Sequence, residues 1–338
     1  MAQVKSLRVS SLLSSFGLPG EGAIPLQTCK TIAEAVQVAE QAHRAELPII
    51  PIGEGTNCAF LESPIPAVFL RSTDQSLKIR QAKSSKILLK VGGGLPWDKL
   101  VRFAVGRGWS GVESLSGIPG TCGAAPVQNI GAYGASLADT LESVEALDLK
   151  TLQTMRLSRA DCGFGYRTSI FNGTERGRFF IASINLRLRT GLHPSPSLAE
   201  IRNTTLQTRR QKLPDYKKIP NCGSFFKNPI IAATVAKKFL QKNPSAPHWP
   251  APAKKTKLSA GWLIENSGAR GKHWGKITIS PQHALVLINQ GETKHVFLKR
   301  AIADITLAVK NKFGILLQTE PNLFDADFAE KIFEKQYQ

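Results

Sequence analysis

The chain has 338 residues, 42% of them hydrophobic, and a formal net charge of +19. This length exceeds the size at which a single hydrophobic core stops growing, so two or three domains are expected. The hydrophobic fraction excludes a disordered chain, and no uninterrupted apolar run reaches the roughly 18 residues that a membrane-spanning helix needs.

The excess of positive charge indicates an anionic partner, although a solvated basic surface would also explain it. Lys and Arg are spread along the chain, and the densest cluster is Lys254, Lys255 and Lys257. Nucleic-acid-binding proteins usually concentrate their charge in blocks or on one helix face. Phosphate-bearing small molecules are therefore favoured as partners over nucleic acid, and we expect neither a nucleic-acid nor a membrane partner.

The cysteines and histidines form no metal-binding pattern. Five widely spaced cysteines, an odd number without a CxxC motif, argue against a disulfide framework and a zinc knuckle. They favour a reducing compartment, and we expect a cytoplasmic monomer. The six histidines lack HxxxH and HExxH spacing, so no metal is expected. The first twenty residues resemble a transit peptide only faintly, and an irregular N-terminal arm is the favoured interpretation.

The first predicted helix covers residues 31–47. Thr31 and Glu34 form a capping box at its start, and small and aliphatic residues then recur at helical spacing. Pro48 ends the helix, and a short buried strand, LPIIPIG, leads into a glycine turn.

Further strands are predicted at 67–71, 86–92, 143–150 and 179–189, with a helix that begins near Trp97. Strands and helices thus mix over residues 20–190, which predicts an α+β domain. A Pro- and Ser-rich linker follows at 190–200. Beyond it we predict the following elements: helices at 201–213, 231–243, 259–268 and 296–314, a proline-rich loop at 244–257, and strands at 284–289 and 315–324.

Glycine is concentrated in three stretches: GEGTN at 53–57, VGGG at 91–94 and SGIPGTCGAAPVQNIGAYG at 116–134. Glycine allows a left-handed backbone and close approach to a ligand, and successive free N–H groups bind anions. The stretches indicate a large phosphate-bearing cofactor, with tight turns in a β-rich domain as the alternative. Neither GxGxxG in a βαβ unit nor GxxxxGK[ST] is present, which disfavours a Rossmann fold and a P-loop.

Six motifs together resemble one family. GEGTN, SGIPGTCGAAPVQNIGAYG, FGYRTSIF, GSFFKNP, AGWLIENSGARG and ALVLIN occur in the order and spacing of the UDP-N-acetylenolpyruvoylglucosamine reductase family. The resemblance extends from about residue 15 to residue 324. It implies an α+β protein with a two-subdomain FAD-binding fold of the vanillyl-alcohol-oxidase (PCMH) type and a C-terminal α+β substrate-binding domain.

The domain boundaries that we expect follow from this resemblance. Residues 1–72 would form the first FAD-binding subdomain, 73–200 the second and 201–318 the substrate-binding domain. Residues 319–338 would form a C-terminal strand and tail that packs back on the first subdomain.

The resemblance also implies a reaction. The family is a flavoenzyme of peptidoglycan precursor synthesis, a UDP-N-acetylmuramate dehydrogenase that holds FAD non-covalently and uses NADPH. It reduces UDP-N-acetyl-3-O-(1-carboxyvinyl)-glucosamine to UDP-N-acetylmuramate. Cys122 in the long glycine stretch is interpreted as a packing variant. Another FAD-dependent oxidoreductase of the same fold with a different substrate is one alternative, and a non-enzymatic basic binding protein is another.

Three residues match the family's catalytic positions. Ser224 of GSFFKNP would donate a proton to C2, Arg167 of FGYR would stabilise the charge that develops on the substrate carboxylate, and Glu320 would act as a second acid or as a relay for Ser224. Taken singly, Ser224 could be a turn or cap serine. Arg167 with Tyr166 could be a surface pair, and Glu320 an edge-strand carboxylate.

The resemblance assigns binding residues as well. Substrate contacts are expected from Tyr166, Lys212 and Asn228. Contacts to FAD are expected from Gly53, Glu54, Gly55, Thr56, Asn57, Ser116, Gly117, Ile118, Pro119, Gly120, Gly123, Ala124, Gln128, Asn129, Gly131, Ala132 and Tyr133.

The chain departs from the family's pattern at three places on the substrate side. Leu198 stands where a loop tyrosine is expected, Trp249 replaces a second tyrosine, and Asn322 replaces an arginine. We therefore expect the same reaction with an altered grip on the substrate.

Overall fold

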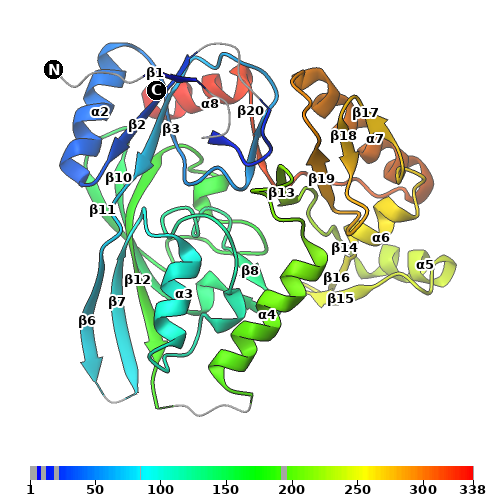
Figure 1. Ribbon diagram of the computed structural model, residues 1–338, viewed down its shortest axis with the longest axis horizontal. Helices are drawn as coiled ribbons and strands as arrows, with labels where there is room; N and C mark the ends of the chain where they lie inside the picture. Colours follow the sequence, from blue (N-terminus) through cyan, green and yellow to red (C-terminus); the bar gives the residue numbers. More distant parts are fainter. Residues whose placement is uncertain (1–5, 9–12, 19–22, 84, 192–195, 338) are drawn as a thin grey trace.

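The structure is a computed structural model that describes residues 6–8, 13–18, 23–83, 85–191 and 196–337. The chain folds into three lobes built on separate sheets, and α4 crosses between them (Figure 1). One cluster of buried side chains is shared by the first two lobes. The prediction of an α+β protein is confirmed. Within the described ranges, every helix is too short or too polar to cross a membrane.

The first lobe holds a sheet in the order β1-β2-β5-β3, in which β2, β5 and β3 run parallel; the strands are Ser6–Arg8, Ala23–Cys29, Val68–Ser72 and Ile49–Pro51. Helix α2 (Ile32–Arg44) is capped by Thr31, whose Oγ1 accepts from the N–H of Glu34. The Glu34 carboxylate accepts from Lys30 N rather than from Thr31 N, so the predicted capping box is shifted by one residue. The helix also ends earlier than predicted, because Glu46 turns left-handed (φ 52°).

The C-terminal segment belongs to the same lobe. Strand β20 (Asn322–Phe324) pairs in parallel with β4 (Cys58–Phe60), and helix α8 (Ala326–Tyr337) lies beside β3. Phe324 packs on the rings of Phe60 and Phe69. The prediction of a strand over 315–324 is wrong for its first seven residues, which are tied to GSFFKNP by individual backbone hydrogen bonds instead.

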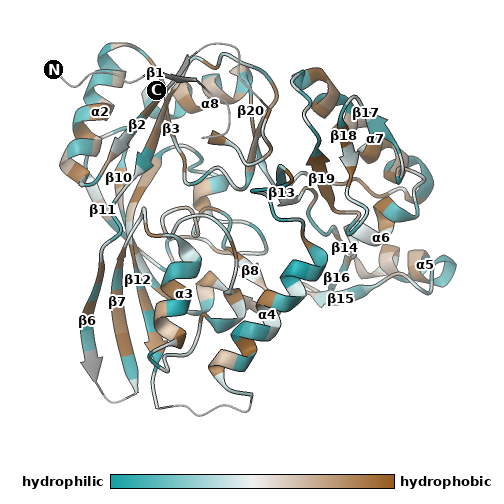
Figure 2. Cartoon of the chain, in the orientation of Figure 1, coloured by the Kyte–Doolittle hydropathy of each residue, from teal (hydrophilic) through white to brown (hydrophobic). Residues whose placement is uncertain are grey.

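The second lobe is a five-stranded antiparallel sheet in the order β11-β10-β12-β7-β6; the strands are Thr154–Ser158, Leu141–Asp148, Phe179–Arg189, Lys86–Gly92 and Leu77–Lys83. Helix α3 (Trp97–Val105) buries Trp97, Leu100 and Val101 in the core of this lobe. Figure 2 colours the long strands of this sheet largely hydrophobic and the exposed side of α3 hydrophilic. Short strands β8 and β9, Gly131–Ala132 and Ala135–Ser136, form a separate two-stranded hairpin in this lobe.

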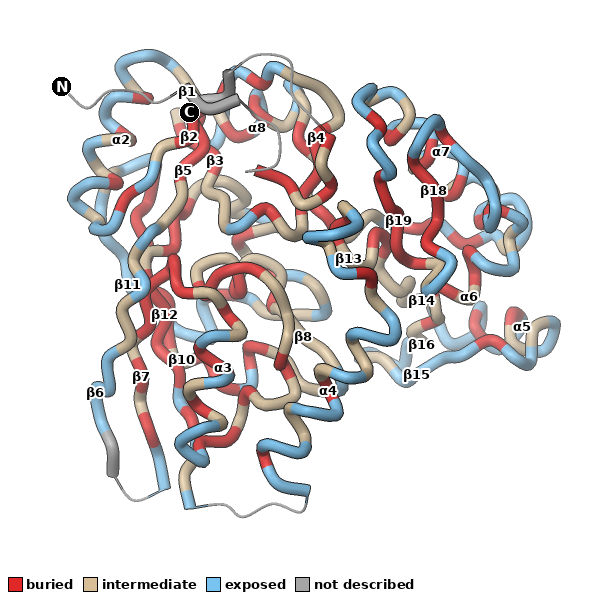
Figure 3. Tube along the Cα trace, in the orientation of Figure 1, coloured by how far each residue is buried: buried red, intermediate tan, exposed pale blue. Residues whose placement is uncertain are grey.

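The third lobe combines a four-stranded sheet, β13-β19-β18-β17, with a three-stranded sheet, β14-β16-β15. The strands of the two sheets are Asn221–Ser224, Val286–Asn289, Ile277–Ile279 and His273–Trp274, and Ile230–Ala232, Lys255–Leu258 and His248–Ala251. The helices are α5 (Ala233–Lys242), α6 (Ala260–Glu265) and α7 (His295–Phe313). In Figure 3 the strands β18 and β19 are buried, whereas α5 and the β15–β16 hairpin are largely exposed.

Two predictions for this half of the chain are wrong. The proline-rich loop at 244–257 contains the hairpin of β15 and β16, and Pro250 is tolerated because β15 is the edge strand of its sheet. The linker at 190–200 is also shorter than predicted. Helix α4 (Leu198–Lys212) starts within it, capped by a reciprocal pair of hydrogen bonds between Ser197 and Glu200. Residues 192–195 lie outside the described ranges.

Candidate active site

A cavity of about 620 Å³ lies where the three lobes meet. All three predicted catalytic residues, Ser224, Arg167 and Glu320, line it. So do most of the predicted cofactor contacts, namely Gly53, Glu54, Gly55, Thr56, Asn57, Gly117, Ile118, Pro119, Gly120, Ala124, Gln128 and Gly131. The fold therefore brings together residues that are spread over the whole sequence.

The turn at 53–57 has the geometry of an anion site. Its N–H groups from Gly53 to Thr56 donate no hydrogen bond to any described residue. Gly55 has φ 72°, and a Cβ there would lie 2.2 Å from the carbonyl oxygen of Leu13. A Cβ on Gly120, at φ 100°, would lie 3.1 Å from the Thr56 hydroxyl. Two glycine turns thus approach each other closely with free N–H groups between apolar walls, which fits the diphosphate and rings of a dinucleotide such as FAD.

Five predicted cofactor contacts do not line the cavity: Ser116, Gly123, Asn129, Ala132 and Tyr133. Gly123 packs against the backbone of Gly93, since a Cβ there would lie 3.0 Å from the Cα of Gly93. Asn129 holds the wall together, because its amide donates to Gly165 O and accepts from Ala138 N. Ser116 is fully buried, whereas Tyr133 is exposed at the end of the β8–β9 hairpin.

Ser224 stands at the end of β13, where the strand is irregular. The pairing of β13 with β19 slips between Asn221 and Ser224, and Gly223 between them has φ 71°. The side chain of Asn221 fixes this bend by accepting from Gly223 N and donating to the carbonyls of Pro214 and Ile219. The Ser224 hydroxyl has no hydrogen-bond partner among the described residues, so it is free to act on a ligand in the cavity.

Glu320 faces Arg167 across the cavity wall. The Arg167 Nε lies 2.8 Å from a carboxylate oxygen of Glu320, whose side chain is 10% exposed. Burial raises the pKa of Glu320, and Arg167 and Lys227 partly oppose that shift. Arg167 has a left-handed backbone (φ 54°), a conformation that is uncommon outside glycine and often found at functional sites.

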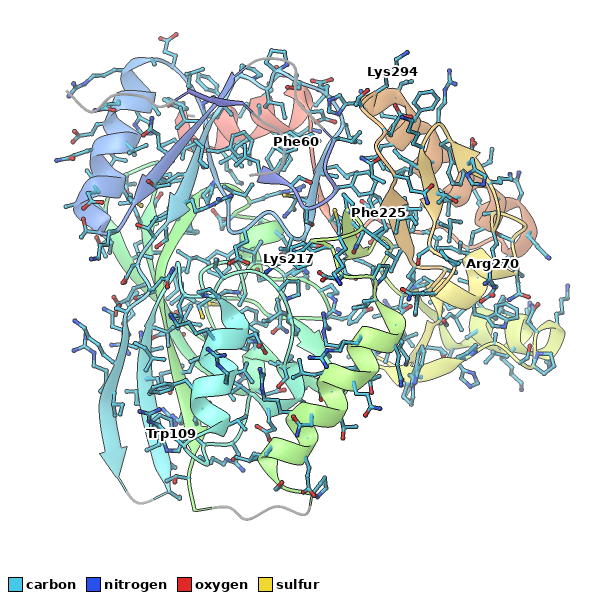
Figure 4. All side chains as sticks on the ribbon, viewed as in Figure 1. Phe60, Trp109, Lys217, Phe225, Arg270 and Lys294 are labelled. Carbon is cyan, nitrogen blue, oxygen red and sulfur yellow. The ribbon has the colours of Figure 1, made fainter. Side chains whose placement is uncertain are left out.

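The segments that carry these residues are tied together by the backbone. Glu320 N donates to Phe225 O, and Lys227 N donates to Gln318 O. The side-chain amide of Asn57 donates to Gln128 and to the carbonyl of Glu320. Figure 4 shows Phe225 close to the centre of the molecule, where β13 lies. The glycine turn, the serine strand and the glutamate segment therefore form one hydrogen-bonded frame.

The predicted substrate contacts lie beside the cavity. Burial raises the pKa of Tyr166, and neighbouring Asn228 is among the groups that oppose this shift. The side-chain Oδ1 of Asn228 also accepts from Ala260 N at the start of α6. The Lys257 ammonium stands 5.1 Å from the centre of the Tyr166 ring and 5.4 Å from that of Trp249. Tyr166 and Asn228 are thus adjacent, and Trp249 and Lys257 extend the same surface.

Lys212 is more remote. It is exposed at the end of α4 and does not line the cavity, although its charge reaches His283 and helps burial to lower the pKa of that histidine. Leu198 is buried at the start of α4, so no loop side chain projects from that position. Asn322 lines the cavity and accepts a hydrogen bond of 3.0 Å from Arg176.

Sequence analysis missed the basic residues that α4 presents to the cavity. Arg202 pairs with Asp98, Leu206 would meet a Cβ on Gly117, and the Arg209 Nε donates to Gly117 O at 3.0 Å. Arg209 and Arg210 both line the cavity. Basic residues in the last turn of a helix are common because they stabilise its dipole. The sequence alone therefore does not distinguish that common role from contact with the cavity. The spacing of 202, 206 and 209 on one face was the available signal.

Cysteines and metal-binding groups give no further site. All five thiols are free and buried, and burial raises the pKa of Cys122 strongly, which fits a packing role in the core of the second lobe. Among the described residues, no three His, Cys, Asp or Glu side chains are grouped as metal ligands would be.

Comparisons with known proteins agree with this geometry. A sequence model described as "FAD binding domain" matches residues 26–155, and one described as "UDP-N-acetylenolpyruvoylglucosamine reductase, C-terminal domain" matches residues 214–324. The solved UDP-N-acetylenolpyruvylglucosamine reductase (MurB) of Thermus caldophilus superposes with a TM-score of 0.69 over 95% of this chain and 99% of its own, at 23% identity. The chain is therefore an FAD-binding protein with the fold of that solved structure.

Two curated relatives identify the family. The UDP-N-acetylenolpyruvoylglucosamine reductase of Azoarcus sp. (strain BH72) is 34% identical over 91% of this chain and 94% of its own length. That of Pseudomonas aeruginosa is 36% identical over 86% and 91%. The chain belongs to the UDP-N-acetylenolpyruvoylglucosamine reductase family.

Proposed function

We propose that this protein uses NADPH to reduce UDP-N-acetyl-3-O-(1-carboxyvinyl)-glucosamine to UDP-N-acetylmuramate, a step of peptidoglycan precursor synthesis. The observation that carries the proposal is the meeting of Ser224, Arg167 and Glu320 in a cavity whose glycine turns fit FAD. Membership of the reductase family supports it.

The reaction adds a hydride to C3 and a proton to C2 of the enolpyruvyl group. Bound FAD, reduced by NADPH, would supply the hydride. The turns at 53–57 and 117–120 would hold its diphosphate without a covalent bond, since the buried Cys122 thiol is packed in the core. Arg209 and Arg210 add fixed positive charge to the same cavity.

Arg167 stabilises the negative charge that grows on the carboxylate side of the substrate. A guanidinium is a cation with a planar fork of donors that can bind a carboxylate through two N–H groups. Lys227 supports it, although burial together with Arg176 and Arg167 lowers the pKa of Lys227. The positive groups around Glu320 thus suit a substrate that brings its own carboxylate.

Ser224 delivers the proton to C2. A hydroxyl is a weak acid, so it protonates only a basic carbon and must then regain its proton. Glu320 can return that proton, because its raised pKa keeps the carboxyl protonated at a higher pH than an ordinary glutamate. The free hydroxyl of Ser224 and the buried acid both face the cavity.

Substrate contacts, domains and location complete the proposal. Tyr166, Asn228 and Lys212 would hold the UDP-sugar, and residues 1–72, 73–200, 201–318 and 319–338 would divide the chain. One chain supplies all the catalytic residues, so a monomer would suffice. The proposed location is the cytoplasm, where NADPH and reduced thiols are maintained.

The test uses the purified yellow holoenzyme. NADPH oxidation should depend on the enolpyruvyl substrate, and the product should gain two hydrogens by mass. In Ser224→Ala, NADPH should still reduce the flavin, whereas reoxidation by substrate should slow by about 10²–10⁴-fold. Equal loss in both half-reactions would remove Ser224 from the proton-donor role. Reoxidation by a different acid alone would favour another oxidoreductase of this fold.

A further inference from the structure

The positive charge of the chain is concentrated in one region. Residues 201–318 contain 21 Lys and Arg but only four Asp and Glu, a net charge of +17. All other residues together contain 23 basic and 21 acidic side chains, a net charge of +2. The third lobe and α4 therefore carry nearly all of the +19, which a count over the whole chain hides.

The four acidic side chains of this region do not neutralise its surface. Asp215 accepts from the backbone of its own turn, and Glu292 accepts from backbone N–H groups of Lys276, Thr293 and Lys294. Asp304 accepts from the Trp274 indole, and Glu265 pairs with Arg270.

Few of the 21 basic side chains have an acidic partner. Among the described residues, those that form an ion pair with a carboxylate are Arg202, Arg270 and Lys299. The others leave an excess of charge on the surface. Figure 4 shows Lys294 at the outer side of this lobe.

The exposed charges continue into the cavity. Lys237 and Lys238 on α5, and Lys254 and Lys255 at the hairpin of β15 and β16, are exposed. On the same hairpin, Lys257 reaches the Tyr166 ring beside the catalytic pair. Half-buried Lys227 and the cavity-lining Arg209 and Arg210 continue this positive charge from the solvent to the site.

We propose that this basic surface is an electrostatic approach surface for small diphosphate-bearing anions. The surface raises the rate at which NADPH and the UDP-sugar reach the cavity. This proposal rests on the proposed function, because these are the ligands of the proposed reaction. Clefts lined by one sign of charge raise on-rates by about 10–10³-fold, and the effect falls steeply with ionic strength. Small anions are favoured over a nucleic acid because the charge leads inward instead of forming a stripe on one helix face.

The test compares two variants that each remove four positive charges. Lys237→Gln/Lys238→Gln/Lys254→Gln/Lys255→Gln neutralises the approach surface, and Lys30→Gln/Lys78→Gln/Arg80→Gln/Lys86→Gln neutralises exposed residues of the first two lobes. Association of the enolpyruvyl substrate with oxidised holoenzyme is followed by stopped-flow flavin absorbance, and NADPH reduction of the flavin is a second reporter. Both are measured from about 0.01 to 0.5 M salt, over which the Debye length falls from about 30 Å to a few ångströms.

At low salt, the approach-surface variant should associate about 3–10-fold more slowly than the parent, with a flatter salt dependence, and the rates should converge at high salt. Dissociation rates and the control variant should change less than about twofold. Equal slowing in both variants would show that the rate depends on the net charge of the whole protein and not on this surface, and it would overturn the proposal. An unchanged rate in the approach-surface variant would also overturn it.

Two outcomes separate this inference from the proposed function. If the enzyme turns over but the salt dependence of association is the same in the approach-surface variant as in the parent, the approach surface is wrong and the reductase activity stands. If flavin reduction by NADPH depends on salt as expected but the enolpyruvyl substrate is never used, the approach surface stands and the proposed reductase activity is wrong. If neither NADPH nor the enolpyruvyl substrate reacts, both proposals are wrong. Tight binding of a mixed-sequence DNA duplex at physiological salt, lost only in the approach-surface variant while substrate association is unchanged, would assign the surface to nucleic acid.

Discussion

The Nε of Arg167 lies 2.8 Å from the carboxylate of Glu320, and both side chains face the cavity that Ser224 also lines. Burial raises the pKa of Glu320 while the guanidinium opposes the shift. Burial thus favours the neutral carboxyl and the guanidinium favours the carboxylate, and the ionisation of Glu320 should be visible in the pH profile.

Glu320→Gln should change that profile. In the parent, the protonated carboxyl is the active form, so substrate reduction should slow as pH rises through the raised pKa of Glu320. The amide cannot ionise, so this descending limb should vanish while the rate at low pH falls by about 10²-fold or more. Single-turnover reoxidation of the flavin measures both. If Glu320→Gln keeps the descending limb of the pH profile, that limb belongs to another titrating group.

Lys257→Met should weaken substrate binding. The ammonium lies between the rings of Tyr166 and Trp249, and a cation held on aromatic faces contributes about 0.5–2 kcal/mol. We expect KM for the UDP-sugar to rise about 3–30-fold with little change in kcat, measured at high salt to screen long-range effects. Exposed Lys254→Met on the same hairpin is the matched control. A similar rise in the control would show that the ring contacts are irrelevant.

Gly55→Ala should be far more damaging than Gly134→Ala. Both glycines have left-handed φ, which costs a side chain about 1–2 kcal/mol. A Cβ on Gly55 would also lie 2.2 Å from the Leu13 carbonyl oxygen, whereas one on Gly134 meets nothing within 4 Å. Gly55→Ala should lower the melting temperature markedly and reduce flavin content, measured by the ratio of flavin to protein absorbance. Equal losses would mean that the close approach to Leu13 is not a constraint.

Gln336→Met should loosen α8. The buried amide accepts from Ile49 N and donates to the carbonyls of Ile49 and Gly177. Each buried backbone group left without a partner costs about 1–3 kcal/mol. Amide exchange at Ile49 should accelerate, and thermal stability should fall. Lys335→Met, at an exposed neighbouring position, should change neither. Unaltered exchange in Gln336→Met would show that water replaces the amide at no cost.

Much of the site could be predicted because its residues lie in contiguous motifs. The GEGTN and GSFFKNP motifs match the family as short continuous stretches, so Ser224 and the 53–57 turn could be assigned to the candidate site from the sequence. Glu320 was found by motif alignment, but its partner distance and burial depend on how distant segments meet. No local pattern encodes that meeting.

Other features could not be predicted because tertiary context overrides local preference. Prolines and lysines at 244–257 predict a loop, yet pairing with β14 stabilises a hairpin there. Residues 315–321 are apolar enough for a strand, but no described strand pairs along their length. The role of the inward face of α4 is hidden because Arg209 donates to a backbone carbonyl on another lobe, a partner that the spacing of 202, 206 and 209 does not identify.

The return of β20 and α8 to the first lobe sets an order on biosynthesis. During translation, the strands β2, β3 and β5 emerge long before Phe324 can fill the space between Phe60 and Phe69. The first lobe must wait for the third to be synthesised, and the loop to be closed spans most of the chain. Because Glu320 directly precedes β20, the acid reaches the cavity only when this late closure occurs. The cavity therefore acquires Glu320 only after most of the chain has been made, when β20 pairs with β4.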